Sequence, residues 1–260
     1  MSQKTSIKFI GSNFGDFVSK IHDLTNIEDT VKIKMESENI LMYSMLSNDV
    51  SVLAMKSYLL KTTDYIENFK SDKTFDFIIT SAGKFVKNLR FFVSQPTVKF
   101  DMIYKPLPDD DEVHHVRSGQ FSSEKLKISC VGGEEFKIRD LKKEILEQRL
   151  DPKKSKWGFK ISKSDFADAK KLCNINNEER IMNISVSDGI VTVNESGKWE
   201  LEIDKIEPRN TNLIFGKKYL SNIDGEMDEI NFHIFDTFIL VKDRNSNLML
   251  SFEQDFSNEE

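Results

Sequence analysis

Two stretches of the sequence decide the fold: residues 7–17, IKFIGSNFGDF, and residues 159–169, FKISKSDFADA. They carry the same or a closely related residue at five aligned positions: Lys8 with Lys160, Ser12 with Ser164, Asn13 with Asp165, Phe14 with Phe166 and Asp16 with Asp168. In each stretch an alternating run predicts a short strand, and a serine in the N-cap position predicts the start of a helix. Apolar residues then recur three and four positions apart, as in a helix that packs on a core. We therefore expect one strand–helix unit in each half.

Two further segments, one later in each half, are also similar to each other. Residues 84–89, KFVKNL, and residues 218–223, KYLSNI, share the order lysine, aromatic, aliphatic, variable, asparagine, aliphatic. Each follows a short apolar run that predicts a strand and precedes an alternating one, at residues 98–104 and 230–236. Because these similarities occur in the same order in both halves, they predict that one architectural unit is present twice.

The residues between the helices of each half read as β-structure. Asp188 and Gly189 form a dipeptide that is typical of a tight hairpin turn, and each half ends in a further pair of strand-like runs. Each half should therefore contain a strand, a helix and about three strands, and then the same series again. The expected fold class is α+β, with domains at residues 1–136 and 157–260 and a connector, at least partly helical, at residues 137–156.

The composition limits the class of protein. Hydrophobic residues make up 38% of the 260, which is enough for a packed core, and the formal net charge is −6. Proteins that coat nucleic acid are usually basic, so this charge disfavours that class unless the lysines gather on one inner face. No apolar run approaches the ~18 residues of a membrane helix. Cys130 and Cys173 have neither metal nor disulfide spacing, which favours a reduced, cytoplasmic compartment.

The order and length of the repeated units resemble the DNA sliding-clamp family, the polymerase processivity factors, and the second half is most similar to the clamps of tailed phages. The resemblance implies domains made of paired β-α-β-β-β units, with sheets outside a ring and helices lining its hole. Two domains per chain would require a homotrimer. The implied partners are duplex DNA, a DNA polymerase and a clamp loader, and no membrane. Residues 105–120 and the connector helix have no counterpart in this pattern.

A ring that slides on DNA needs a diffuse positive lining that contacts phosphates and does not read bases. The four expected ring helices offer these candidates for DNA binding: Lys20, Lys84, Lys87, Arg90, Lys163, Lys170, Lys171, Lys217 and Lys218. Helix 13–24 is the weakest of the four, because Asp16 and Asp23 offset its lysine. The alternative is that these cations are the solvated faces of ordinary amphipathic helices.

The resemblance also implies an apolar pocket near the connector and the last strands, where short peptides of partner proteins dock. The candidate residues for partner binding are Leu141, Ile145, Leu146, Leu248, Leu250 and Phe252. The alternative for each of these residues is a place in the hydrophobic core.

Other constellations give no catalytic site. Residues 81–84, SAGK, lack the first glycine and the final hydroxyl residue of a phosphate-binding loop. The acidic stretch 109–115, with His114 and His115, could bind a metal, although a solvent-exposed linker is the expected interpretation. We therefore expect no enzyme, no cofactor and no metal. Two alternatives to the closed clamp stay open: a processivity factor that binds DNA by charge without forming a ring, and a structural or adaptor protein without nucleic acid.

Overall fold

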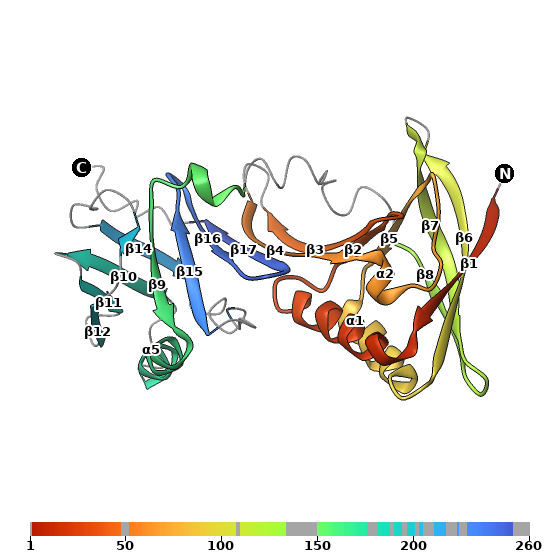
Figure 1. Ribbon diagram of the computed structural model, residues 1–260, viewed down its shortest axis with the longest axis horizontal. Coiled ribbons are helices and arrows are strands. Elements are labelled where there is room, and N and C mark those ends of the chain that lie inside the picture. Colours follow the sequence, from red (N-terminus) through yellow and green to blue (C-terminus); the bar gives the residue numbers. More distant parts are fainter. Residues whose placement is uncertain are drawn as a thin grey trace. The chain divides into compact units, whose positions relative to one another are not determined.

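The computed structural model describes residues 2–47, 52–107, 110–133, 150–175, 181–187, 190–193, 197–200, 203–204, 211–216, 223 and 228–251. The chain forms two compact units (Figure 1). Unit 1 comprises Met1–Leu46 and Lys56–Leu141, and unit 2 comprises Ser47–Met55 and Lys142–Glu260. The domain limits expected at residues 136 and 157 stay a prediction, because most of the connector lies outside the described residues.

Unit 1 has the expected series of a strand, a helix and three strands, followed by the same series again, so the predicted α+β class is confirmed. Its elements, in chain order, are β1 (Gln3–Ile10), α1 (Gly11–Leu24), β2 (Val31–Met35), β3 (Asn39–Ser47), β4 (Val52–Lys61), the single-turn α2 (Thr62–Tyr65), β5 (Thr74–Ile79), α3 (Ala82–Leu89), the 3-10 turn η1 (Arg90–Phe92), β6 (Thr97–Leu107), β7 (Asp110–Ser122) and β8 (Lys127–Val131). The first residues of β4, Val52–Met55, belong to unit 2.

The strand order in unit 1 is β1-β6-β7-β5-β2-β3-β4, with β8 beside β7. Neighbours such as β1 and β6 or β2 and β5 are antiparallel, whereas β5 and β7 pair in parallel from Thr74–Val113 to Asp76–His115. The stretch 105–120 therefore includes the last residues of β6 and most of β7, which pair as a long antiparallel hairpin. The interpretation of residues 109–115 as an exposed linker was wrong for the histidines, because His114 and His115 are buried in β7. Among the described residues no group of three or more histidine, cysteine or carboxylate side chains could hold a metal ion.

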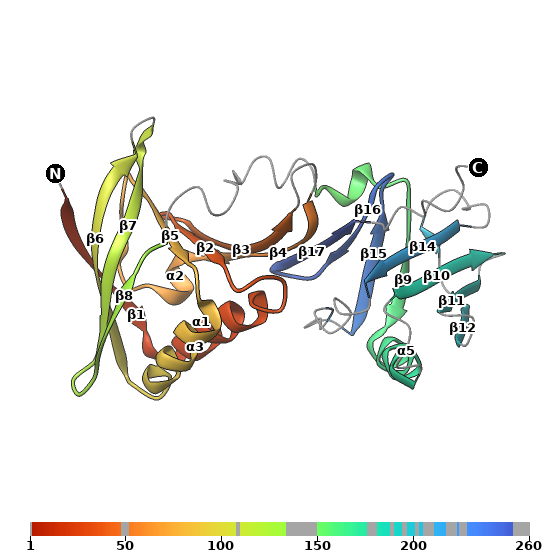
Figure 2. The ribbon, with the colours of Figure 1, turned by 180° about the vertical axis from the view of Figure 1, so that it is seen from behind.

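The core of unit 1 lies between the sheet and the two helices α1 and α3, which lie side by side against one of its faces (Figures 1 and 2). The predicted periodicity of α1 is confirmed, since its buried apolar residues are Phe14, Phe17, Val18, Ile21 and Leu24. Phe100 and Phe121 stack at 4.1 Å between ring centroids. Gly119 makes room for this stack, because a Cβ atom there would lie 2.2 Å from the ring of Phe100.

Neither of the aligned serines, Ser12 and Ser164, is the N-cap, because α1 begins before Ser12 and α5 begins before Ser164, directly after a different serine, Ser162. Helix α1 begins at Gly11, directly after Ile10 and without a side-chain cap, and Ser12 Oγ donates to Asn13 instead. A Cβ atom at Gly11 would lie 2.3 Å from the carbonyl oxygen of Pro96, so this close approach requires glycine at the turn into the helix. In the second half the Ser162 hydroxyl accepts a hydrogen bond from the Asp165 backbone at 3.0 Å.

Unit 2 contains a similar series of elements. They are β9 (Trp157–Ser162), α5 (Lys163–Ile175), β10 (Ile181–Ser187), β11 (Ile190–Val193), β12 (Gly197–Glu200), β13 (Ile203–Asp204), β14 (Thr211–Gly216), β15 (Glu229–Ile234), β16 (Phe238–Lys242) and β17 (Ser246–Ser251). The strand orders are β17-β16-β15-β9-β13 and β12-β11-β10-β14. Strands β10 and β11 form the hairpin predicted around residues 188–189. The helix predicted at residues 218–223 lies, except for Ile223, outside the described residues. No helix in the described part of the chain is long and apolar enough to span a membrane.

Candidate nucleic-acid interface

Helix α3 presents the clearest positive surface. It buries Ala82, Phe85, Val86 and Leu89 against the core, so its remaining faces point away from the sheet. Lys84, Lys87 and Arg90 are all exposed, and none of them takes part in an ion pair with another described residue. Lys87 and Arg90 also lie at the C-terminal end of the helix, where the helix dipole favours a positive charge. The structure therefore places these three predicted cations where an anion can reach them.

The N-terminus of α3 is fixed by the loop before β2. Ala82 N donates to the Asp29 carbonyl oxygen at 2.9 Å, and Gly83 N donates to the Asp29 carboxylate at 2.7 Å. These contacts satisfy two of the backbone donors that a helix leaves unpaired at its start. Together with the buried face, they hold the exposed cations of α3 in a defined orientation.

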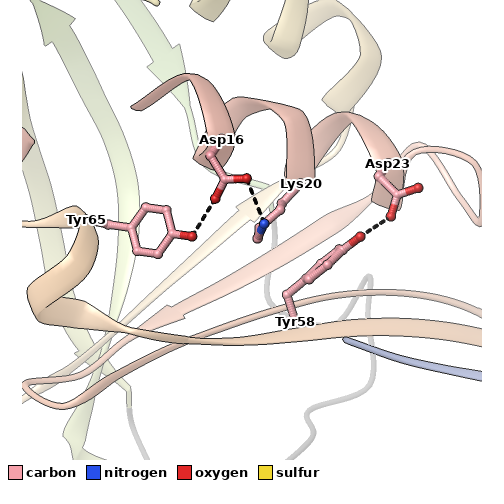
Figure 3. Close-up of polar contacts among 5 residues, drawn as sticks. All are labelled: Asp16, Lys20, Asp23, Tyr58 and Tyr65. Carbon is pink, nitrogen blue, oxygen red and sulfur yellow. Dashed lines mark hydrogen bonds and ion pairs between the residues drawn. The ribbon is translucent and has the colours of Figure 1, made fainter. Parts of the chain in front are cut away.

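Helix α1 does not offer its lysine to solvent (Figure 3). The Lys20 side chain is 8% exposed; its ammonium lies 2.8 Å from Asp16 Oδ1 and 5.4 Å from the centroid of the Tyr58 ring. The other carboxylate oxygen of Asp16 accepts from the Tyr65 hydroxyl at 2.5 Å. The expected exposure of Lys20 is therefore wrong, because Tyr58 from β4 and Tyr65 from α2 cover the side of α1 that carries it.

Asp23 is tied into the same layer of polar contacts. It accepts a short hydrogen bond from the Tyr58 hydroxyl and forms an ion pair with Lys56 Nζ at 2.6 Å. The exposed side chains of α1, apart from Asp16, are Ser12, Ser19 and His22. In unit 1 the exposed positive charge of the two long helices is thus concentrated on α3.

In unit 2 two of the expected cations lie exposed on α5. Lys163 and Lys171 are exposed, and Lys171 forms an ion pair with Asp168 at 2.8 Å in which both side chains are largely solvated. Exposed pairs of this kind contribute little to stability, so Lys171 can exchange its partner readily. Lys170 lies on the same helix. Lys217 and Lys218 lie outside the described residues.

The candidates for partner binding fall into two groups, those that are buried and those that lie outside the described residues. Leu248 and Leu250 on β17 are 3% and 1% exposed, so in this chain they are core residues of unit 2 and not part of an open surface. Leu141, Ile145, Leu146 and Phe252 lie outside the described residues.

One exposed residue next to the cations was missed by the sequence reasoning. Phe91, in η1, is 64% exposed, whereas its neighbour Phe92 is fully buried. The signal was present in the sequence, because Phe91 follows Lys87 by four positions and so falls on the polar side of the helix.

Comparisons with known proteins bear on the fold. No protein-family model matches the sequence, and none of the curated proteins compared with it matches. Solved structures do match. The DNA polymerase III β subunit of Thermotoga maritima superposes with a TM-score of 0.65 at 12% identity, over 96% of this chain and 65% of that chain. The chain has the sliding-clamp fold.

Two further clamps support this assignment. The proliferating cellular nuclear antigen of Entamoeba histolytica matches with a TM-score of 0.57 at 13% identity, over 96% of this chain and 98% of that chain. The Helicobacter pylori β clamp bound to a DNA ligase peptide matches with a TM-score of 0.61 at 10% identity, over 97% of this chain and 68% of that chain. The fold implied by the sequence resemblance is thus confirmed, whereas the particular similarity to clamps of tailed phages stays a prediction.

Proposed function

We propose that this protein is a sliding clamp, a non-enzymatic processivity factor that encircles duplex DNA and tethers a DNA polymerase. The observation that carries the proposal is the exposed cation stripe of α3 in a chain that has the clamp fold and a formal net charge of −6. Such a chain repels DNA from most of its surface and attracts it to a few helices.

The DNA face is proposed to consist of lysines and one arginine that contact phosphates without reading bases. Its members are Lys84, Lys87, Arg90, Lys163, Lys170, Lys171, Lys217 and Lys218. Lysine suits sliding because its ammonium is a mobile point charge, whereas arginine fixes a bidentate geometry. Lys20 is left out, since its ammonium is buried beside Asp16 and Tyr58.

The proposed assembly is a homotrimer. The chain covers 98% of the Entamoeba clamp chain but 65% of the Thermotoga β subunit. A chain with two clamp domains needs three copies for a ring of six domains. In solution the trimer has about three times the 30.1 kDa of one chain.

The proposed partners are a clamp loader and peptides of a polymerase or other DNA enzymes. The proposed compartment is the cytoplasm, which is that of the host cell if the protein is viral. The peptide-bound Helicobacter clamp supports a peptide site on this fold. Leu141, Ile145, Leu146 and Phe252 are the candidates that we keep for it, because Leu248 and Leu250 are buried.

Retention on circular and linear DNA tests the ring. We expect the protein, once loaded, to stay on a nicked circular plasmid at about 0.5 M salt, where the Debye length is well below 10 Å, and to leave within seconds of linearisation. The double variant K84E/K87E should still form the trimer but load less efficiently. Tight, steeply salt-dependent binding to linear duplex without a loader would instead identify an open processivity factor, and no binding to either DNA would favour an adaptor protein.

A further inference from the structure

The exposed ring of Phe91 lies on the same stripe as the cations of α3. The backbone stays helical through Leu89, Arg90 and Val93, so α3 and η1 form one continuous helical run. At roughly 100° per residue in α3 and roughly 120° per residue in the 3-10 turn, positions 84, 87 and 91 fall within about 80° of one another on the helix surface. They lie opposite the buried residues of the same run, which are Ala82, Phe85, Val86, Leu89 and Phe92.

This arrangement differs from an ordinary apolar docking patch. Phe91 is flanked along the stripe by Lys87 and, one turn further, by Lys84, while Arg90 is its sequence neighbour. Val93, the nearest exposed apolar residue in sequence, faces Gly15 of α1, where a Cβ atom would lie 3.0 Å from Val93 Cγ1. An isolated aromatic ring among cations is complementary to a nucleic-acid strand, which presents phosphates and the flat faces of its bases together.

We propose that Phe91 stacks on an unpaired base, so that α3 and η1 bind the single-stranded side of a primer–template junction. This inference rests on the proposed function and adds a DNA structure that the clamp recognises. Bases inside a duplex are already stacked, and separating them costs free energy, whereas the first unpaired template base has a free face. Every base has such a face, so the contact distinguishes paired from unpaired DNA without reading sequence.

Two fluorescence signals from the protein mixed with two labelled probes test the proposal: anisotropy measures affinity, and 2-aminopurine intensity reports stacking on the base. One probe is a primer–template junction with a single-stranded overhang that carries 2-aminopurine at its first unpaired position, and the other is a blunt duplex. The wild-type protein should quench the 2-aminopurine fluorescence. The F91A variant should lose this quenching and bind the junction about 5- to 150-fold more weakly, because stacking on an aromatic side chain strengthens binding by about that factor per base. Its affinity for the blunt duplex should change less than twofold, and F91W should restore both signals.

The matched control is V131A. Val131 is 79% exposed on the edge strand β8 and alternates with Cys130, which packs towards the core, so it points to the sheet face opposite the helices. V131A removes a similar exposed apolar group and should leave both affinities unchanged.

Either of two binding results would overturn the inference: F91A binds the junction as tightly as the wild type, or F91A loses affinity for the junction and the duplex equally. A change in the sedimentation of F91A would overturn it as well, because it would place Phe91 between copies of the chain. The variant K84E/K87E separates this failure from that of the proposed function. If it weakens binding to both probes while F91A does not discriminate between them, only the stacking is wrong. If it weakens neither, the DNA-binding function itself is wrong.

Discussion

Replacing Lys20 by methionine should destabilise unit 1 and leave the protein's affinity for DNA unchanged. Replacing Lys87 by methionine should weaken DNA binding and leave the stability unchanged. Both residues are helix lysines that the sequence proposes for DNA binding, Lys20 on the weakest of the four expected helices. In the structure Lys20 contacts Asp16 and the Tyr58 ring, and Lys87 is exposed on α3. Methionine keeps the length and most of the apolar stem of lysine, so the substitution chiefly removes the charge.

The expected loss of stability for K20M follows from the exposure of the two partners. Removing one partner of a fully buried pair costs ~3–5 kcal/mol, and a solvated pair contributes ~0–1 kcal/mol. The Lys20 side chain is 8% exposed but that of Asp16 is 48% exposed, so water can solvate the carboxylate that is left behind. Adding a cation–π contact of ~0.5–1 kcal/mol with Tyr58 gives about 1–2 kcal/mol in total. For a unit of this size that lowers the melting temperature by roughly 4–8 °C.

Differential scanning calorimetry measures the stability, and a salt titration of duplex affinity measures the DNA contact. Each lost phosphate contact reduces the slope of log affinity against log salt by about 1. For K87M this slope should be smaller by about 1 than for the wild type. Its melting temperature should stay the same, since surface substitutions change stability by about 0.5 kcal/mol or less. If K20M lowers the salt slope as K87M does and keeps the wild-type melting temperature, Lys20 contacts DNA and is not a buried structural residue.

Three further substitutions or modifications test how the helices and the sheet are held. D29A should lower the free energy of unfolding by about 0.5–2 kcal/mol in urea titrations, because Gly83 N loses its acceptor at the start of α3, and D29N should retain most of it. G119A should cost about 1–3 kcal/mol by the same measurement, since the new methyl group meets the Phe100 ring, and an unchanged midpoint would contradict the packing. Burial raises the pKa of the Cys130 thiol from 9.0 to about 12, so its peptide should resist alkylation at pH 8.5 in the folded protein and react after unfolding. Because the unfolded thiol ionises first, this group's contribution to stability should fall as the pH rises from 9.0 towards about 12.

The sequence predicted the features that depend on local pattern. Phe14, Phe17 and Ile21 repeat with the period of a helix, and their side chains are buried as expected. The alternation in residues 98–104 likewise gave β6. The order of elements followed because the same patterns recur in both halves, and the resemblance of that order to the sliding-clamp family implied the clamp fold.

Features that depend on distant residues were not predictable in this way. Lys32 alternates with apolar residues in β2, which suggests a solvated side chain, yet it is buried and forms an ion pair with Asp76 at 2.8 Å. Its partner lies on β5, and only the strand pairing brings the two together. Lys20 is a similar case, because two tyrosines from other elements decide that it is covered. The exposed cations of α3 were predictable because the helix itself turns them away from its own apolar face.

Primer extension on a long, singly primed circular template shows directly whether this protein acts as a sliding clamp. With the cognate polymerase and loader, and with a trap that captures any polymerase that dissociates, this protein should lengthen the products of a single binding event severalfold. K84E/K87E should lose most of that gain, while V131A should keep it. Products of the same length with and without the protein would contradict the claim that it is a sliding clamp.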